Sequence, residues 1–167
     1  MRIGVFAGTF DPFTVGHLDI VKRAAPHFDK LIVAVCVNPG KDEAMFSLDE
    51  RTELISDAVQ GVENVEVARF GGVLIEYCRQ VGASCLVRSI RSSADVDYER
   101  MLESVNRRLD ERIETFFLLS RPEMAHISSS LVRQLIGLGI AIDDLVPNVD
   151  NSIIKSKIAI ILEEGDK

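Results

Sequence analysis

The sequence has few of the residues that mark secreted, membrane-spanning or metal-stabilised proteins. Its 167 residues include no tryptophan and only three cysteines, Cys36, Cys78 and Cys85, with no C-x-x-C pair. An odd number of separated cysteines is typical of buried free thiols in a reducing compartment. The longest apolar run, residues 31–37, is too short to span a bilayer, and the N-terminus lacks the apolar region of a signal peptide. We therefore expect a cytoplasmic protein with no membrane association.

Basic residues are also scarce. Lysine and arginine number 19 against 26 aspartates and glutamates, which gives a formal net charge of −7 and a pI of about 5.0. This charge disfavours a general nucleic-acid-binding function, although a few local cations are enough to bind a phosphorylated small molecule. The length suits one domain over residues 1–167 with a sizeable core.

Several common motifs are missing as well. The sequence contains neither a G-x-x-x-x-G-K-[ST] P-loop nor a G-x-G-x-x-G dinucleotide fingerprint. No cluster of cysteine and histidine suggests a structural metal, and no base stands near an evident nucleophile, so covalent catalysis is not expected. The motifs offer no cage of carboxylates, so we expect no dedicated metal site.

What the chain does contain is a regular alternation of short apolar runs and helical patterns. Strands are predicted at residues 3–6, 30–37, 62–68, 85–87 and 114–119, with helices between them. A capping box at residues 47–50 begins one of these helices. The alternation predicts the α/β class, with right-handed βαβ units in a Rossmann-like, doubly wound parallel sheet of strand order 3-2-1-4-5. A C-terminal helix is predicted over residues 148–163.

The most informative stretch runs from Gly8 to His17 and reads Gly-Thr-Phe-Asp-Pro-Phe-Thr-Val-Gly-His. It joins the first strand to a helix, the place where open α/β sheets bind ligands. Gly8 and Gly16 let the backbone approach a ligand closely, and the new helix offers unpaired N–H groups to an anion. His17 adds a side-chain donor, although a histidine near a helix start often serves only as a capping or surface residue. A helix N-terminus lowers its pKa and a bound phosphate raises it, which leaves its protonation state open.

Other candidate residues have both a functional and a structural interpretation. Thr9 either donates to a phosphate or stabilises the turn. Lys41 and Arg88 each follow a predicted strand, where they would neutralise phosphate or simply end the strand in solvent. Glu99 is either a ligand contact or part of a charged helix surface. The run Ile127-Ser128-Ser129-Ser130 either caps a helix or cradles the β- and γ-phosphates of a nucleotide.

Taken together, these motifs resemble those of a known family. The run Thr14-Val15-Gly16-His17 is similar to the (H/T)-x-G-H signature of the nucleotidylyltransferase superfamily, in which the histidine contacts nucleotide phosphate. Over essentially the whole chain, the sequence resembles the bacterial phosphopantetheine adenylyltransferases. The other matching motifs fall in the family's order and spacing: Gly8-Thr9-Phe10-Asp11-Pro12, Pro39-x-Lys41, Arg88-x-x-Arg91, Asp97-x-x-x-Met101 and Ile127-Ser128-Ser129-Ser130.

The resemblance implies a role for each matching residue. His17 would be the transition-state stabiliser. Contacts with 4′-phosphopantetheine would come from Thr9, Lys41, Leu74 and Arg88. ATP would be bound by a larger set drawn from three segments: Thr9, Phe10, His17, Ser89, Ile90, Arg91, Glu99, Met124, Ala125, His126, Ile127, Ser128, Ser129 and Ser130. The family also implies a homohexamer, with dephospho-CoA or CoA as product or inhibitor.

The implied reaction is adenylyl transfer from ATP to 4′-phosphopantetheine, a step of coenzyme A biosynthesis that yields dephospho-CoA and pyrophosphate. Phosphate is already ionised at neutral pH, so catalysis would depend on positioning and charge stabilisation, with Mg²⁺ on the triphosphate. Two alternatives stay open. One is another small-molecule nucleotidylyltransferase of the superfamily, such as a cytidylyltransferase or a nicotinate-mononucleotide adenylyltransferase. The other is a non-catalytic nucleotide sensor on this fold.

Ser89 departs from the family pattern. The family usually has Arg-Gly-(Leu/Ile)-Arg where this chain has Arg88-Ser89-Ile90-Arg91. If the position needs a positive φ, serine is strained there and glycine is not. The departure therefore raises the hypothesis of a strained backbone at Ser89 that approaches adenosine less closely.

Overall fold

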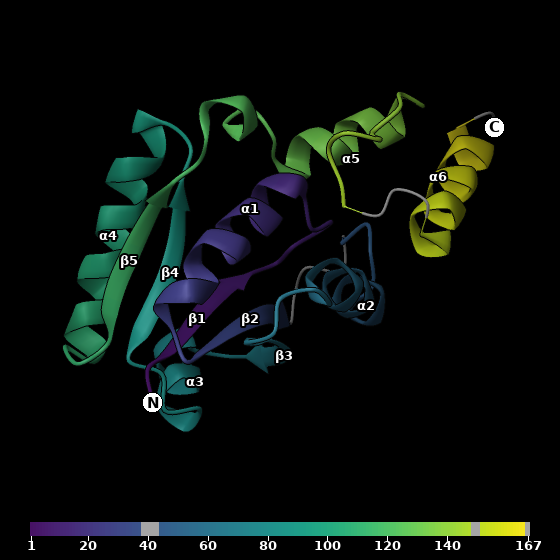
Figure 1. Cartoon of the computed structure of the whole chain (residues 1–167). Helices are drawn as coiled ribbons and strands as arrows, with labels where there is room; N and C mark the ends of the chain where they lie inside the picture. The colour runs from purple at the N-terminus through teal and green to yellow at the C-terminus, as the bar shows by residue number, and fades with distance from the viewer. Residues whose placement is uncertain (38–43, 148–150, 166–167) are drawn as a thin grey trace.

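The computed structural model describes residues 1–37, 44–147 and 151–165, and a five-stranded sheet lies at its centre (Figure 1). The strands are β1 (Ile3–Gly8), β2 (Lys30–Val37), β3 (Val65–Gly71), β4 (Cys85–Ile90) and β5 (Glu114–Leu119). All neighbouring strands are parallel, in the order β3-β2-β1-β4-β5. Both the predicted fold class and the predicted strand order are confirmed.

Helices connect successive strands and continue after the last one. The four connecting helices are α1 (Val15–Ala24), α2 (Leu48–Val59), α3 (Leu74–Gln80) and α4 (Ser93–Leu109), and the 3₁₀ turn η1 (Ala25–His27) follows α1. After β5 come the 3₁₀ turn η2 (Pro122–Met124), then α5 (Ser129–Gly137) and α6 (Ser152–Gly165). The capping box predicted at Ser47 is present, with Ser47 and Glu50 each accepting a backbone N–H of the other.

The sheet is covered on both faces, which explains its nearly continuous apolar strands. Phe6 and Val33 face one side and pack with α1 and α2. Val5 and Ile32 face the other side and pack with α3. Because successive strand residues point to opposite faces, β2 needs apolar residues at every central position, and its sequence supplies them.

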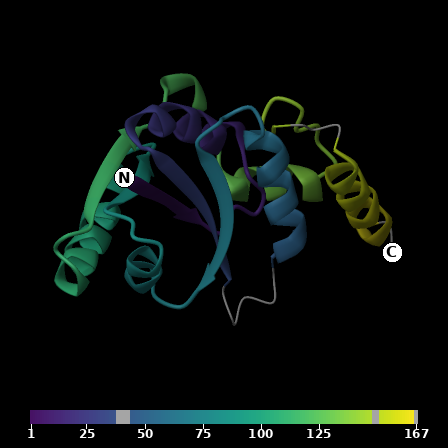
Figure 2. The same ribbon diagram turned by 60° about the horizontal axis from the view of Figure 1, so that its bottom comes forward.

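A third buried cluster lies beside the sheet and joins α5 and α6 to the segment before α2. Phe46, Val132, Ile136 and Ile154 are at most 2% exposed within it. Lys157 on α6 pairs with Glu50 on α2 at 3.1 Å. Figure 2 shows α6 at the opposite end of the molecule from α4 and β5. The predicted C-terminal helix is therefore present, beginning at residue 152; positions 148–150 lie outside the described residues.

The observed strand bounds differ from the predicted ones where backbone hydrogen bonds override the apolar pattern. β4 runs on through Ile90 instead of ending at Val87, because residues 88–90 continue the ladder with residues 117–119 of β5. β3 begins at Val65 rather than at residue 62, since the N–H of Val62 is taken by the carbonyl of Val59 at the end of α2. Polar residues such as Arg88 therefore belong to a strand.

The three cysteines are free thiols. Cys78 and Cys85 are buried as predicted, and burial raises the pKa of Cys78 to about 11. The prediction was wrong for Cys36, which is only partly buried and lines a cavity. No helix within the described ranges is long and apolar enough to cross a membrane.

Candidate active site

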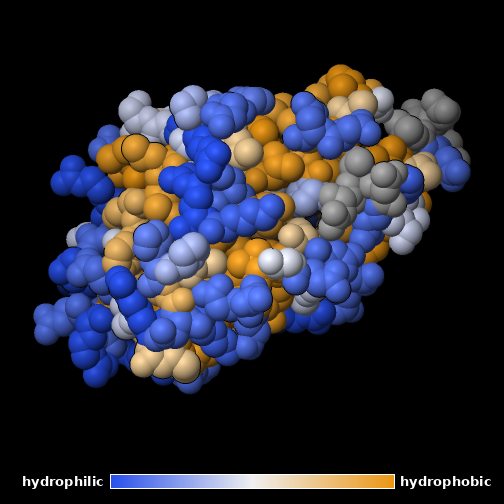
Figure 3. Space-filling view, in the orientation of Figure 1, coloured by the Kyte–Doolittle hydropathy of each residue, from blue (hydrophilic) through white to orange (hydrophobic). Residues whose placement is uncertain are grey.

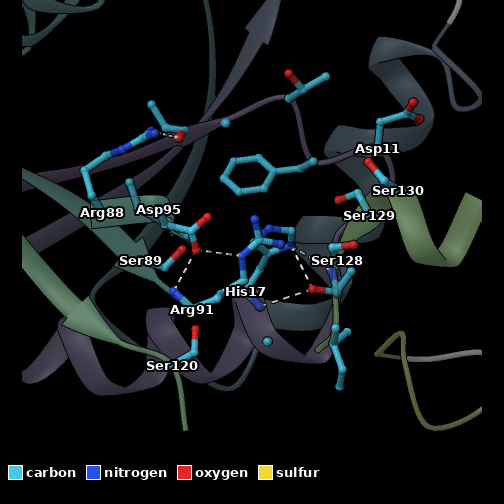
Figure 4. A pocket seen from close by; sticks show the side chains of 18 of the residues that line it. Asp11, His17, Arg88, Ser89, Arg91, Asp95, Ser120, Ser128, Ser129 and Ser130 are labelled. Atoms are coloured by element: carbon cyan, nitrogen blue, oxygen red, sulfur yellow. Dashed lines mark hydrogen bonds and ion pairs between the residues drawn. The ribbon is translucent and has the colours of Figure 1, made fainter. Parts of the chain in front are cut away.

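A cavity of about 670 Å³ opens where β1 and β4 lie side by side. Most of its wall residues come from four segments, the loop after β1, the end of β4, the beginning of α4 and the beginning of α5 (Figure 4), and Cys36 of β2 and Arg51 of α2 also line it. The connections from β1 and β4 leave the sheet on opposite sides, which makes this the switch point where such sheets bind ligands. Four segments spread over more than 120 residues thus meet at one site.

His17 is held at the third position of α1 by a capping box. The N–H of Thr14 donates to His17 Nδ1 at 3.0 Å, and the N–H of His17 donates to Thr14 Oγ1 at 3.3 Å. Thr14 itself is only 1% exposed. Because Nδ1 accepts the Thr14 N–H, the ring proton of a neutral His17 resides on Nε2. The capping role and the functional role of this histidine are therefore compatible.

Three phenylalanines surround the His17 ring. The ring centroids of Phe10 and Phe13 lie 5.1 and 5.4 Å from that of His17, and Phe6 lies at 6.2 Å. Burial, and to a smaller extent the positive charge of Arg91, lowers the pKa of His17 to about 4. His17 is consequently a neutral imidazole at pH 7 in the unliganded protein, with a single N–H donor at Nε2.

Arginines line the cavity, and each is already engaged. Arg88 makes a bidentate pair with Glu99, Nε to Oε2 at 2.8 Å and Nη2 to Oε1 at 2.6 Å. Arg91 lies 3.5 Å from Asp95 (Figure 4), and Arg133 donates to the backbone carbonyl of Asp11 at 2.5 Å. The cavity therefore concentrates cations while the protein as a whole is acidic, which favours anionic ligands locally.

The serine-rich run forms the beginning of α5. Ser128 is the N-cap residue and its hydroxyl accepts the N–H of Leu131 at 3.1 Å. Ser129 donates to the Pro12 carbonyl at 2.8 Å, and Arg133, one turn later, reaches Ser130 at 3.3 Å. All three serines line the cavity, so the positive end of the helix dipole faces it.

The carboxylates in the cavity walls do not form a metal site. Asp11 accepts the N–H groups of Met45 and Phe46 at 3.0 and 2.8 Å. Asp95 accepts backbone N–H groups at the beginning of α4, and both oxygens of Glu99 are taken by Arg88. Across the described ranges, no group of three or more histidines, cysteines and carboxylates could hold a metal ion.

Most residues predicted for the site line this cavity, and some do not. Leu74, Ile90, Ala125 and His126 are not among its walls, and Lys41 lies outside the described residues. Those that do line it come from the loop after β1 and the beginning of α1, from β4 to the first half of α4, and from the segment between η2 and the beginning of α5: Thr9, Phe10, His17, Arg88, Ser89, Arg91, Glu99, Met124, Ile127, Ser128, Ser129 and Ser130. The roles assigned to them by resemblance stay predictions.

Sequence reasoning did not single out several other wall residues. Arg133 was detectable in principle, because it follows Ser129 by four residues and therefore shares its face of the helix. Asp95 stands three residues after Ser92, in the spacing of a capping box. Arg51 carried no such signal, since an arginine on an amphipathic helix is ordinarily a surface residue; here it is 6% exposed and lines the cavity.

The two glycines of the first loop have different structural reasons. A Cβ atom at Gly8 would lie 2.9 Å from the Phe10 ring, so glycine is required for that packing. A Cβ at Gly16 would meet nothing closer than 3.6 Å. Packing therefore does not require glycine at position 16.

The condition for strain at Ser89 is not met. Ser89 lies inside β4 and pairs with Leu118 of β5. Among the described non-glycine residues, a positive φ occurs only at Phe10, with φ of 50°. Ser89 thus has ordinary strand geometry, because the ladder of β5 extends past the end of the apolar run.

The fold and the arginine-lined cavity at the switch point are those of a nucleotide-transferring α/β protein. A family model described as cytidylyltransferase-like matches residues 5–135. A bifunctional NMN adenylyltransferase/ADP ribose pyrophosphatase from Francisella tularensis has a similar structure, with a TM-score of 0.69 and 18% identity, covering 95% of this chain and 52% of that one. At this identity the likeness concerns the fold alone.

Sequence relatives narrow the assignment. The phosphopantetheine adenylyltransferase of Caldanaerobacter subterraneus subsp. tengcongensis is 42% identical over 149 residues, covering 89% of this chain and 92% of the relative. That of Symbiobacterium thermophilum is 44% identical over 155 residues, covering 93% and 95%. The chain therefore belongs to the phosphopantetheine adenylyltransferase family, within the cytidylyltransferase-like proteins.

Replacing Ser89 by glycine should destabilise the protein. Glycine gains more backbone freedom on unfolding, and in a strand interior it costs about 0.5–1 kcal/mol. Urea denaturation of Ser89→Gly beside the wild type measures the difference in the free energy of unfolding. A more stable glycine variant would show instead that serine is strained at this position.

Proposed function

We propose that the protein transfers the adenylyl group of ATP to 4′-phosphopantetheine. A phosphate oxygen of phosphopantetheine forms a bond to the α-phosphorus of ATP, and the bond from that phosphorus to the bridging oxygen of pyrophosphate breaks. The products are dephospho-CoA and pyrophosphate. The observation that carries the proposal is the neutral His17, whose remaining donor lies in a cavity lined by arginines and a helix N-terminus, in a chain more than 40% identical to named phosphopantetheine adenylyltransferases.

In this proposal the nucleotide occupies the side of the cavity formed by α5. Ser128–Ser130 and the first turn of α5 would hold the β- and γ-phosphates, and Arg91 would approach the phosphate chain. Support comes from their position: all of them line the same cavity as His17. Arg91 would have to exchange its contact with Asp95, which is a loose one at 3.5 Å.

The acceptor phosphate would lie toward Arg88 and Thr9, at the ends of β4 and β1. Arg88 has its guanidinium held by both oxygens of Glu99 and by the Ala7 carbonyl at 3.3 Å. With side chains that are 25% and 10% exposed, the Arg88–Glu99 pair is largely shielded from water. We therefore propose that Glu99 orients the Arg88 guanidinium, in addition to any contact that Glu99 makes with ATP.

His17 would stabilise the transition state as a neutral hydrogen-bond donor. Negative charge on the α-phosphate oxygens is redistributed as the phosphorus becomes five-coordinate, and an N–H aimed at that geometry acts mainly on the transition state. The capping contact from Thr14 leaves Nε2 as that donor. Phosphate is an ionised nucleophile, so no residue needs to remove a proton.

Mg²⁺ would come to the site with ATP. The cavity carboxylates are already held by N–H groups or by Arg88, so they offer no cage for the ion. When bound, Mg²⁺ supplies charge neutralisation on the triphosphate.

We also propose a homohexamer. Tyr98, Met101, Val105 and Leu109 form a row on α4 at spacings of three and four residues, and they are 58, 54, 51 and 49% exposed. Leu119 of β5 is 67% exposed at the same end of the molecule, where Figure 3 shows apolar side chains among polar ones. A row of exposed apolar side chains of this kind is typical of a protein interface, and a second copy of this chain would cover it.

Pyrophosphate release tests the activity directly. We expect release only when ATP, Mg²⁺ and 4′-phosphopantetheine are all present, with dephospho-CoA appearing in equal amount by chromatography. Release with nicotinate mononucleotide or CTP in place of these substrates would favour another nucleotidylyltransferase. ATP binding by calorimetry without turnover would favour a nucleotide sensor.

An Arg88→Ala variant should raise the KM for phosphopantetheine far more than that for ATP.

Replacing His17 by alanine should lower kcat by about 10²–10³, the effect of losing one donor to a developing oxyanion. The KM for ATP should change little, because the α5 side of the site is untouched. His17→Gln, which retains an N–H donor, is the matched control and should recover part of the loss. Unchanged kcat in a stable alanine variant would remove His17 from catalysis.

The low pKa of His17 also predicts two pH profiles. If the neutral form is the donor, no fall in kcat due to His17 is expected between pH 6 and 8, whereas a protonated donor would lose activity across that range.

The second profile is that of stability. The folded-state pKa of His17, about 4, lies below the ordinary value of 6.5. The unfolded chain therefore binds the proton first as the pH falls. The resulting stability is present above pH 6.5 and is lost on acidification toward pH 4, and His17→Gln should lack this loss in denaturation experiments.

The α4 row should control the oligomeric state. Met101→Asp places a charge in the centre of the row and should reduce the mass measured by light scattering. Arg100→Asp, exposed on α4 and neither three nor four residues from any member of the row, should leave the mass of the assembly unchanged. An unchanged mass for Met101→Asp would place the interface elsewhere.

A further inference from the structure

Arg51 is a buried cation whose partners are all backbone carbonyls. Its Nη1 donates to the Thr9 carbonyl at 2.7 Å and its Nε to the Phe46 carbonyl at 3.0 Å. Longer contacts reach the carbonyls of Ser47 at 3.3 Å and Cys36 at 3.4 Å. No described carboxylate forms an ion pair with it, although its side chain is more than nine-tenths buried. A buried charge left without a counterion is costly to keep, which calls for a reason beyond packing.

The guanidinium joins three segments that border the cavity: the loop after β1, the end of β2 and the beginning of α2. Asp11, in the same loop after β1, also binds the segment before α2: its carboxylate accepts the N–H groups of Met45 and Phe46. The loop after β1 is thus held to α2 and the segment before it through the Thr9 carbonyl and the Asp11 carboxylate. The loop cannot shift relative to α2 without breaking charge-assisted hydrogen bonds.

The contact with Thr9 has a direct geometric consequence for the next residue. In a trans peptide the C=O and the N–H point in opposite directions. With the Thr9 carbonyl held by Arg51, the N–H of Phe10 lies on the side of the peptide away from Arg51. No described residue accepts this N–H, and both Thr9 and Phe10 line the cavity.

Phe10 also has the φ of 50° that non-glycine residues rarely adopt. A left-handed conformation of this kind is unfavourable for a residue with a side chain and persists only where the surroundings impose it. The Phe10 ring is 4% exposed and packs against Phe6 and Phe13 at centroid distances of 5.3 and 5.4 Å. Packing therefore fixes the ring of Phe10, and the hydrogen bond from Arg51 fixes the peptide that precedes Phe10.

We propose that Arg51 is a positioning residue that orients the Thr9–Phe10 peptide, so that the free Phe10 N–H donates to a phosphate oxygen of the nucleotide. Its charge, which among the described residues is compensated only by carbonyl dipoles, also draws the phosphate toward this loop. Arg51 itself lines the cavity, so its charge lies within reach of a bound phosphate. The kinetic consequences of this assignment rest on the proposed adenylyl transfer. The orientation of the Thr9–Phe10 peptide does not depend on that proposal.

Three variants separate orientation, charge and stability. Arg51→Met keeps much of the aliphatic stem and loses the donors and the charge. Arg51→Lys keeps the charge, but a single ammonium cannot reproduce the planar guanidinium that holds separated carbonyls. Ser47→Ala removes the N-cap of α2 and lowers stability while leaving the Thr9 contact in place.

We expect Arg51→Met to lower kcat/KM for ATP by about 10²-fold, the effect of misplacing a contact by roughly 1 Å. Arg51→Lys should recover only a small part of that loss. Ser47→Ala should lower the melting temperature and change kcat/KM by no more than about twofold. A folded Arg51→Met with kcat and KM near the wild-type values would show a purely structural role. Full recovery by lysine would likewise overturn the positioning role.

The amide resonance of Phe10 gives a readout that does not need turnover. In ¹⁵N–¹H spectra, addition of ATP should move this resonance in the wild type and in Ser47→Ala, but not in Arg51→Lys or Arg51→Met. If the methionine variant does not fold, the lysine variant decides. A Phe10 shift in the lysine variant equal to that of the wild type would overturn the proposal. Absence of pyrophosphate release by the wild type would instead count against the proposed function and leave this titration interpretable.

Discussion

The pairing of β1 with β4 is the interaction on which the site depends. Only three residue pairs define it, Gly4–Cys85, Val5–Leu86 and Phe6–Val87, but it joins halves of the sheet whose connections run in opposite directions. Because parallel strands place their carboxyl ends at one edge, this short ladder brings the loop of Thr9 and His17 against Arg88 and Arg91. Without this pairing the cations and the histidine would belong to separate surfaces.

A second constraint is the management of charge in the unliganded cavity. Arg88 is held by Glu99, Arg91 by Asp95 and Arg133 by the Asp11 carbonyl, and the partners of Arg51 in the described part of the chain are all carbonyls. The Arg88–Glu99 pair is tight and bidentate, whereas Arg91 makes a looser ion pair and Arg51 and Arg133 donate to carbonyls, contacts that hold these three cations in place without fully neutralising them. An acidic protein can therefore present a local site for phosphate, since the field within a cleft is set by the nearest charges and not by the net charge. The neutral His17 adds a donor to this site without adding to the repulsion among the cations.

Much of the architecture was predictable because it follows from local patterns. The nearly continuous apolar run of β2 indicated a strand covered on both faces, and the capping boxes marked helix starts by satisfying N–H groups within one turn. The alternation of strands and helices implied the strand order. The strand ends were less predictable, because Arg88–Ile90 are strand residues only by virtue of their partners in β5. The same reason explains why a strained Ser89 was a reasonable hypothesis and an incorrect one.

By itself, the sequence determined the fold class, the position of the loop that we propose binds phosphate, and the family resemblance, because each depends on residues close together in the chain. The tertiary structure decided what depends on contacts between distant residues. It places His17 among three phenylalanines and so makes it neutral. It pairs Glu99 with Arg88 across 11 positions, and it buries Arg51 against the carbonyl of Thr9, 42 residues away. The pKa of a group and the orientation of a peptide are set by surroundings that only folding assembles, so no local pattern could have revealed them.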